Sequence, residues 1–241
     1  MSMQVKKEMV WVCKTMWDKG WVASNDGNVS VKIGKDRFLT TPSGISKGFI
    51  SVKMILEVNC QGKVLKGDAK YKPSSEFALH SHCYQRRADV RAVVHAHPPF
   101  STAFAITKTP LSAFSLIEAV MAFGEVPVAP YALPGTAEVA NSIDPFLPSH
   151  DAVLLANHGA VTIGNSLMAA FFRMESLELT AKTLAIARLI GKEQRLSPKQ
   201  IEEILKQQGS GNGNGQTAGI RERKGKKGEQ KGTTGTAVDS G

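Results

Sequence analysis

Three histidines and one glutamate have the residue types and spacing that metal chemistry requires. His95 and His97 end an expected strand, where residues two apart share a face and their Cα atoms lie about 6 to 7 Å apart. His158 follows a second apolar strand, and Glu76 falls in the first turn of an expected helix. Neutral imidazoles with one carboxylate oxygen are ligands that zinc takes in catalytic sites. Spacing alone leaves open a second interpretation, a chance histidine pair and an unrelated loop histidine.

The other histidines do not extend this set. His80 and His82 are two apart on a helix, so their side chains point to different faces, and we expect surface or packing roles. His150 has no partner that the sequence identifies.

Three segments of small polar residues precede the histidine pair and could hold an anion. They are Gly27-Asn28-Val29-Ser30, Thr41-Pro42-Ser43-Gly44 and Ser74-Ser75. Hydroxyls and free N–H groups at a helix N-terminus favour a phosphate, which makes the serine pair the strongest case. Each segment alone is better explained as a turn or a cap than as an anion site. Their joint occurrence predicts an anion site.

Alternating helices and short strands must position these residues. A helix over 4–19 ends at Gly20, and another opens at 73–76 with Ser74 as its N-cap. Hairpins favour antiparallel pairing. The pattern predicts a three-layer α/β/α sandwich around a mainly antiparallel central sheet, with strands at 28–33, 37–41, 54–59, 63–65, 91–97, 126–131 and 152–156 and further helices at 115–123, 136–146 and 166–190.

Composition predicts one domain over 1–208 and a disordered, glycine-rich basic tail over 209–241, because the tail has no periodic apolar face. Part of the net charge of +9 lies in this tail, without interleaved aromatic residues, so we expect no nucleic-acid partner.

The three cysteines form no disulfide pattern. The chain shows no membrane-spanning run and no secretory signal, and we therefore expect a cytoplasmic protein without a membrane partner.

Six segments, in order and spacing, resemble the class II aldolase and epimerase family, and most closely its L-fuculose-phosphate aldolase-like members. They are GNVSV (27–31), TPSGI (41–45), PSSE (73–76), VVHAHPP (93–99), APYALPGT (129–136) and LLANHG (154–159). The resemblance covers about residues 4 to 205. It implies a homotetramer with sites between subunits and one Zn²⁺ per subunit.

The resemblance also implies a reaction and roles for residues. A ketose 1-phosphate, such as L-fuculose 1-phosphate, would be cleaved reversibly to dihydroxyacetone phosphate and a short aldehyde, with Glu76 transferring the proton. A glutamate rather than an aspartate at this position favours aldolases over epimerases. The implied zinc ligands are Glu76, His95, His97 and His158, and the implied phosphate-binding residues are Asn28, Ser43, Gly44, Ser74 and Ser75.

Two positions depart from the fuculose enzymes, because Leu116 and Gln208 stand where tyrosines are expected. Glu118 could supply the missing acid, since an apolar setting raises the pKa of a carboxyl, or it could have a structural role. Two other lyases on this scaffold therefore stay open, a methylthioribulose-1-phosphate dehydratase and a phosphorylated-sugar-acid decarboxylase. A non-catalytic, adducin-like interaction module is the alternative of another class.

Overall fold

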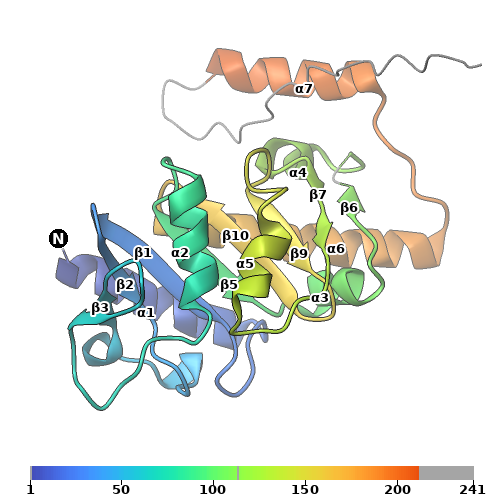
Figure 1. Ribbon diagram of the computed structural model, residues 1–241. Coiled ribbons are helices and arrows are strands. Elements are labelled where there is room, and N and C mark those ends of the chain that lie inside the picture. The colour runs from blue at the N-terminus through green and yellow to red at the C-terminus, as the bar shows by residue number, and fades with distance from the viewer. Residues whose placement is uncertain (1, 113, 212–241) are drawn as a thin grey trace, which may run out of the picture.

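The computed structural model of the protein describes residues 2–112 and 114–211, the last four by their backbone alone. Within these residues, eight strands form one sheet in the order β4-β3-β2-β1-β5-β10-β9-β8 (Figure 1). All neighbouring strands are antiparallel except β8 and β9, which confirms a mainly antiparallel sheet. The strands are β1 (Asn28–Gly34), β2 (Arg37–Thr40), β3 (Leu56–Val58), β4 (Val64–Lys66), β5 (Ala92–Ala96), β8 (Val128–Ala129), β9 (Ala152–Leu155) and β10 (Gly159–Gly164).

Helices cover both faces of this sheet, and the predicted three-layer sandwich is confirmed. Adjacent residues of β5 point to opposite faces: Val94 joins the apolar cluster with α1 and α6, and Val93 joins the cluster with α2 and α5. The helices are α1 (Ser2–Asp18), α2 (Phe77–Arg86), α3 (Pro99–Ile106), α4 (Ile117–Ala122), α5 (Ala137–Ile143), α6 (Leu167–Ile190) and α7 (Pro198–Gly211). A separate small sheet pairs β6 (Leu111–Ser112) with β7 (Glu125–Val126).

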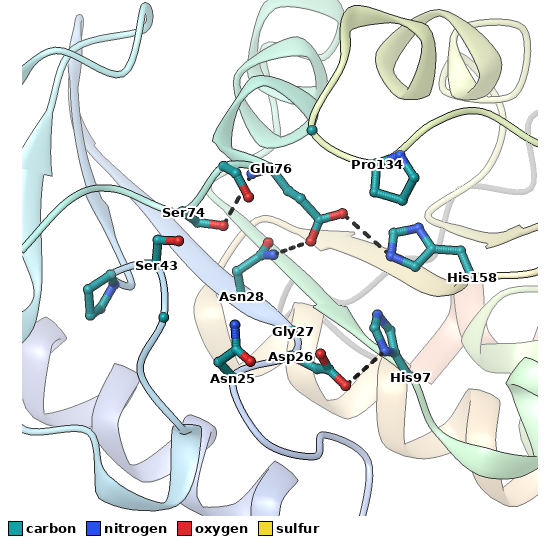
Figure 2. A pocket seen from close by; sticks show the side chains of 14 residues that line it. Asn25, Asp26, Gly27, Asn28, Ser43, Ser74, Glu76, His97, Pro134 and His158 are labelled. Carbon is teal, nitrogen blue, oxygen red and sulfur yellow. Dashed lines mark hydrogen bonds and ion pairs between the residues drawn. The ribbon is translucent and has the colours of Figure 1, made fainter.

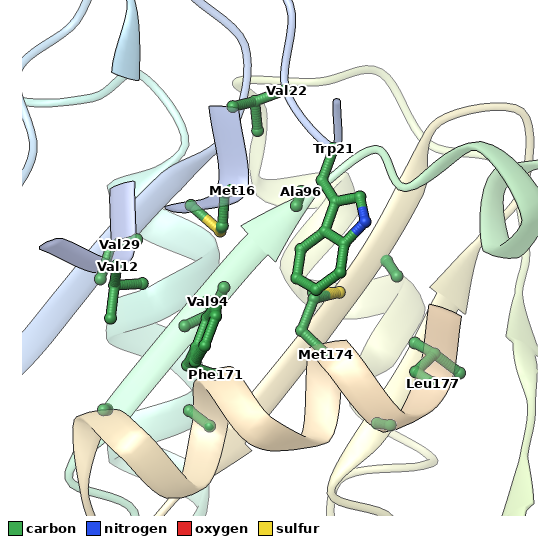
Figure 3. Packing of buried hydrophobic residues seen from close by; sticks show 14 of the residues in the cluster. Val12, Met16, Trp21, Val22, Val29, Val94, Ala96, Phe171, Met174 and Leu177 are labelled. Carbon is green, nitrogen blue, oxygen red and sulfur yellow. The ribbon is translucent and has the colours of Figure 1, made fainter. Parts of the chain in front are cut away.

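The larger apolar cluster fixes α1 and α6 against the central strands. Met16 of α1 and Phe171 of α6 are fully or almost fully buried, and Trp21 lies between the end of α1 and α6 (Figure 3). The rings of Trp21 and Phe171 are 6.0 Å apart. Burying one such aromatic side chain stabilises the fold by roughly 1.5–3 kcal/mol. This packing holds the chain that leaves α1 close to the end of β5, where the histidine pair lies.

The predicted start of α2 was wrong in detail. The helix begins at Phe77 with Glu76 as its N-cap residue, and the Ser74 hydroxyl accepts from the Glu76 N–H (3.3 Å) in the preceding turn. The cause is a tertiary contact: the Ser74 N–H donates to the Thr41 carbonyl (3.2 Å), and the Ser43 N–H donates to the Lys72 carbonyl (2.8 Å). The backbone before Glu76 is therefore tied to the chain that follows β2 and is not free to join the helix.

Several elements differ from the prediction. The expected strand 126–131 is divided between β7 and β8, and the expected strand 54–59 is shortened to β3 because Val52–Met54 forms a 3-10 helix. Helix α3, strand β10 and helix α7 were not predicted. The backbone of 209–211, assigned to the tail, continues α7, and the rest of the predicted tail lies outside the described residues.

No helix in the described part of the chain is long and apolar enough to cross a membrane.

Candidate metal and phosphate site

Three imidazoles meet at one end of the sheet. His95 lies on β5, His97 follows that strand, and His158 lies in the turn between β9 and β10, beside β5. The turn needs Asn157 in the left-handed region (φ 59°), a conformation that asparagine tolerates better than most residues. The three ring centroids are 4.7 to 4.9 Å apart, and one nitrogen of each ring lies within 4.8 Å of the others. The strands therefore bring together the histidines that the sequence predicted.

Backbone and carboxylate partners orient two of these rings. His95 Nδ1 lies 2.9 Å from the Ala160 carbonyl, so Nδ1 carries the hydrogen and Nε2 presents its lone pair. His97 Nδ1 lies 3.7 Å from an Asp26 carboxylate oxygen, on the side away from His95. Burial lowers the pKa of His95 well below its usual value, and the neighbouring imidazoles lower it further. Burial also lowers the pKa of His97. Both rings are held neutral, as metal ligands must be.

Glu76 completes the group at the start of α2. Its Oε2 lies 3.5 Å from His95 Nε2 and accepts a hydrogen bond from Asn28 Nδ2 (2.8 Å). Its Oε1 lies 3.5 Å from His158 Nε2 and is buried without a hydrogen-bond partner. A buried oxygen without a hydrogen-bond partner destabilises the fold unless a ligand binds to it.

The spacing of these atoms fits a metal ion. His95 Nε2 and His97 Nε2 are 3.1 Å apart, and nitrogen atoms so close share either a proton or a cation. In a tetrahedral zinc site with ligands at about 2.0–2.1 Å, the ligand atoms are about 3.3 Å from one another. The separations of 3.1 and 3.5 Å match that geometry, and the unpartnered Glu76 oxygen provides a further donor. The residues present therefore fit a metal ion held by three nitrogens and one carboxylate.

A pocket of about 240 Å³ opens beside this group (Figure 2). Glu76, His97 and His158 line one side of it, and residues from each of the three small polar segments line the other (Figure 2). All five residues predicted to bind phosphate line this pocket, namely Asn28, Ser43, Gly44, Ser74 and Ser75.

Gly27 shapes the floor of the pocket. It has a φ of 67°, which disfavours a side chain, and an added Cβ would lie 2.9 Å from the His95 carbonyl oxygen and 2.5 Å from Val22 Cγ1. A side chain at position 27 would therefore push the chain away, and only glycine there lets Asn28 lie beside Glu76 and the histidines.

The remaining lining residues were not named as individual ligand-binding residues, although Gly27 and Pro42 lie in the segments predicted to hold an anion. They are Asn25, Asp26, Gly27, Pro42, Pro134 and Gly135. Pro134 and Gly135 belong to the APYALPGT segment, which was a signal in the sequence, and they come from the loop before α5. Asn25 and Asp26 carry no such signal, because only the packing of the chain after α1 brings them to the pocket.

Glu118 lies apart from this pocket. It is exposed in the first turn of α4 and is absent from the pocket lining, so the apolar setting expected for it is not found within the subunit. Leu116 is the N-cap residue of the same helix. The side chain of Gln208 is outside the described residues.

The other histidines have structural partners. His80 is buried, as the packing role requires, and its Nδ1 lies 2.7 Å from Ser30 Oγ. His82 bonds to Asp144 (2.7 Å). His150 Nδ1, for which the sequence identified no partner, lies 3.1 Å from the Phe146 carbonyl.

Comparisons with known proteins match the chain to one protein family and to named relatives in it. Residues 7–185 match the model of the class II aldolase and adducin N-terminal domain. The 3-oxo-tetronate 4-phosphate decarboxylase of Haemophilus influenzae is 34% identical over 182 residues, which cover 73% of this chain and 85% of the relative. The L-fuculose phosphate aldolase of Methanococcus vannielii is 34% identical over 177 residues, covering 73% and 93%. A solved L-fuculose 1-phosphate aldolase superposes with a TM-score of 0.78 at 32% identity, covering 86% of this chain and 96% of that one.

Proposed function

The chain belongs to the class II aldolase and adducin N-terminal domain family and is one of its lyases, and we propose that it is a zinc-dependent aldolase acting on a ketose 1-phosphate. The products would be dihydroxyacetone phosphate and a short aldehyde. One observation carries this proposal: three imidazoles and a carboxylate converge beside a pocket lined by hydroxyl and amide groups. The convergence of all four expected ligands disfavours an adducin-like, non-catalytic role.

The phosphate end of the substrate would lie among Asn28, Ser43 and the serine pair before α2. These groups supply hydroxyls and an amide, which bind phosphate oxygens. The carbonyl end would then face Glu76 and the three histidines across the pocket. Such binding fixes the substrate in one orientation, which by itself lowers the barrier to reaction.

Zinc held by Glu76, His95, His97 and His158 would supply a Lewis acid that stabilises negative charge on the substrate oxygens. For this step Glu76 would give up its place as a metal ligand and transfer the proton at the carbon next to the carbonyl, in the direction of condensation. Its position supports this role, because one carboxylate oxygen is unpartnered and Asn28 holds the other.

Exchange of a substrate proton in heavy water tests the role of Glu76. With zinc and dihydroxyacetone phosphate, the wild-type chain should exchange one proton of the hydroxymethyl carbon, and Glu76→Gln should slow this about a hundredfold or more. Zinc content and thermal unfolding are measured on both proteins. Glu138→Gln is the matched control, because Glu138 contacts the Leu133 N–H near the pocket without lining it. Unchanged exchange in folded, zinc-loaded Glu76→Gln would reject the proposed role.

A decarboxylase is the second candidate, favoured by the 34% identity to the 3-oxo-tetronate 4-phosphate decarboxylase. Loss of carbon dioxide from a 3-oxo acid leaves the same type of electron-rich carbon next to a carbonyl, so the same donor set suits both reactions. The dehydratase stays a further alternative. A panel of L-fuculose, L-rhamnulose, L-ribulose and methylthioribulose phosphates and a phosphorylated 3-oxo acid, followed by product analysis, separates these activities.

We also propose that the protein is a homotetramer. Large apolar side chains are exposed near the end of α6, where Leu189 is 87% and Ile190 is 83% exposed in the isolated subunit. A partner would also change the surroundings of Glu118, which lacks an apolar environment in one subunit. Light scattering measures the assembly directly, and a monomer would contradict the proposal.

A further inference from the structure

Lys47 is buried behind the phosphate pocket, in a position that lysines almost never occupy without a charged partner. The residue is 1% exposed. Its Nζ donates hydrogen bonds to the carbonyl oxygens of Asn25 (3.1 Å) and Ile45 (2.8 Å). The carboxylates that favour its charge, Asp26 and Glu76, lie beside the histidines instead, 3.7 Å from His97 Nδ1 and 3.5 Å from His95 Nε2 respectively. The ammonium is therefore held by neutral carbonyl groups.

Local packing forces this side chain inward. Lys47 opens a short 3-10 helix (Lys47–Phe49), and the Ser46 hydroxyl caps it by accepting from the Gly48 N–H. The helix lies flat against α1, since a Cβ on Gly48 would come 2.6 Å from Trp17 Cδ2. Because this face of the helix is closed by α1, the Lys47 side chain extends between α1 and the pocket loops.

The two carbonyls that Lys47 binds belong to both loops on one side of the pocket. Asn25 lines the pocket itself, and Ile45 directly follows the lining residues Ser43 and Gly44 (Figure 2). One ammonium thus ties together two loops that are about twenty residues apart in the sequence.

The pocket has an unusual charge balance for a phosphate site. Its lining residues include no lysine or arginine, and the charged groups among them are Asp26 and Glu76. A phosphate monoester carries nearly two negative charges at neutral pH. Hydroxyl and amide donors can orient such a dianion, and a positive charge close to the phosphate would offset part of its negative charge.

We propose that Lys47 is a positioning residue that also stabilises the bound phosphate through its buried positive charge, without touching it. This inference rests on the proposed function, since it requires phosphate to bind among Asn28, Ser43 and Ser74. Charges inside a protein are screened far less than surface charges, so an ammonium one loop behind the pocket still acts on the anion.

Burial lowers the pKa of Lys47, and negative charge at Asp26 and Glu76 opposes this shift. A bound dianion would oppose it further. Phosphate binding and the charge of Lys47 therefore support one another.

Binding of inorganic phosphate to the zinc-loaded wild-type chain and its variants, measured by titration calorimetry, tests the proposal. Lys47→Met removes both the charge and the hydrogen bonds, whereas Lys47→Gln removes the charge and keeps a donor. Lys47→Arg keeps both. The matched control is Lys6→Met, because Lys6 Nζ also donates to a backbone carbonyl, that of Ile55 (2.7 Å), but binds no pocket loop.

If the positive charge of Lys47 stabilises the bound phosphate, Lys47→Met and Lys47→Gln should each weaken phosphate binding about tenfold. Lys47→Arg should bind phosphate within about threefold of wild type, and Lys6→Met should bind it as the wild type does. If Lys47→Met does not fold, the comparison of Lys47→Gln with Lys47→Arg decides. Phosphate affinity unchanged in folded Lys47→Gln would overturn the inference and leave the proposed function intact. A wild-type chain that binds neither phosphate nor a sugar phosphate would overturn both.

Discussion

Gly159 and His97 are in such close contact that a Cβ built on Gly159 would lie 2.6 Å from His97 Cδ2. The same Cβ would lie 2.5 Å from the Ala96 carbonyl oxygen. Strand β10 therefore approaches the end of β5 at van der Waals distance, and the approach sets the plane of the His97 ring. The shape of the metal site depends on a residue that offers no ligand.

Replacing Gly159 by alanine should displace His97 and weaken zinc binding about 10- to 100-fold, the range typical of changes next to metal ligands. The measurement is competition with a chromogenic chelator. Gly191→Ala is the control, because nothing lies within 4 Å of its added Cβ. If Gly159→Ala bound zinc as tightly as Gly191→Ala, the contact with His97 would not govern the site.

The grouping of the proposed metal ligands could be predicted because their positions follow from local rules. Two histidines at spacing two on a strand must share a face, and His158 follows a strand whose apolar residues marked it as central. Glu76 was found for the same reason, at the start of a recognisable helix. The sheet register then brought these ends together, with His95 opposite Asn28 on one side and Val161 on the other.

The parts that could not be predicted depend on contacts between distant residues. Helix α3 begins at Pro99, directly after the expected strand, and its first N–H groups are capped by Glu178, 77 and 78 residues away. Lys47 lies in a segment that looks like a polar turn, and only packing against α1 reveals that it is buried. Sequence spacing carries no information about such contacts.

Glu178 should be a major determinant of stability. This buried carboxylate accepts from the N–H groups of Phe100 (2.9 Å) and Ser101 (2.8 Å) and from the Ser101 hydroxyl (2.7 Å), directly after the segment that holds His97. Glu178→Ala leaves these donors buried without an acceptor, so we expect a loss of about 2–4 kcal/mol in the free energy of unfolding.

Urea denaturation of the metal-free chain measures this loss. The control on the same helix is Glu175→Ala, which removes an exposed ion pair with Lys19 (3.0 Å) and should cost less than about 1 kcal/mol. Equal losses in the two variants would show that Glu178 contributes no more than a surface pair.

Asn28 should report which side of the pocket binds the phosphate. Its Nδ2 donates to Glu76, and its Oδ1 is buried without a hydrogen-bond partner. Asn28→Asp keeps the shape but places a carboxylate against Glu76 and against any bound anion. We expect phosphate affinity to fall about a hundredfold in Asn28→Asp and about tenfold in Asn28→Ala. Calorimetry with dihydroxyacetone phosphate measures both; equal losses would mean that the anion lies elsewhere in the pocket.

Acid should destabilise the protein partly through His80. Burial lowers the pKa of this histidine to about 3, against an unfolded value of about 6.5. Between these values the unfolded chain binds a proton that the folded chain does not, so the stability is fully present above pH 6.5 and is lost as the pH falls toward 3. His80→Asn keeps a polar partner for Ser30 and removes the titration.

Between pH 7 and pH 5, the metal-free wild-type chain should therefore lose about 2 kcal/mol more stability than His80→Asn. Urea denaturation at both pH values measures the difference, and His95 and His97 contribute equally to both proteins, so their titration cancels. His82→Asn is the matched control: His82 lies on the same helix but is partly exposed and bonds to Asp144. Parallel losses of stability in wild type and His80→Asn would mean that His80 accepts a proton in the folded chain, and the contact with Ser30 would then have to open to water at low pH.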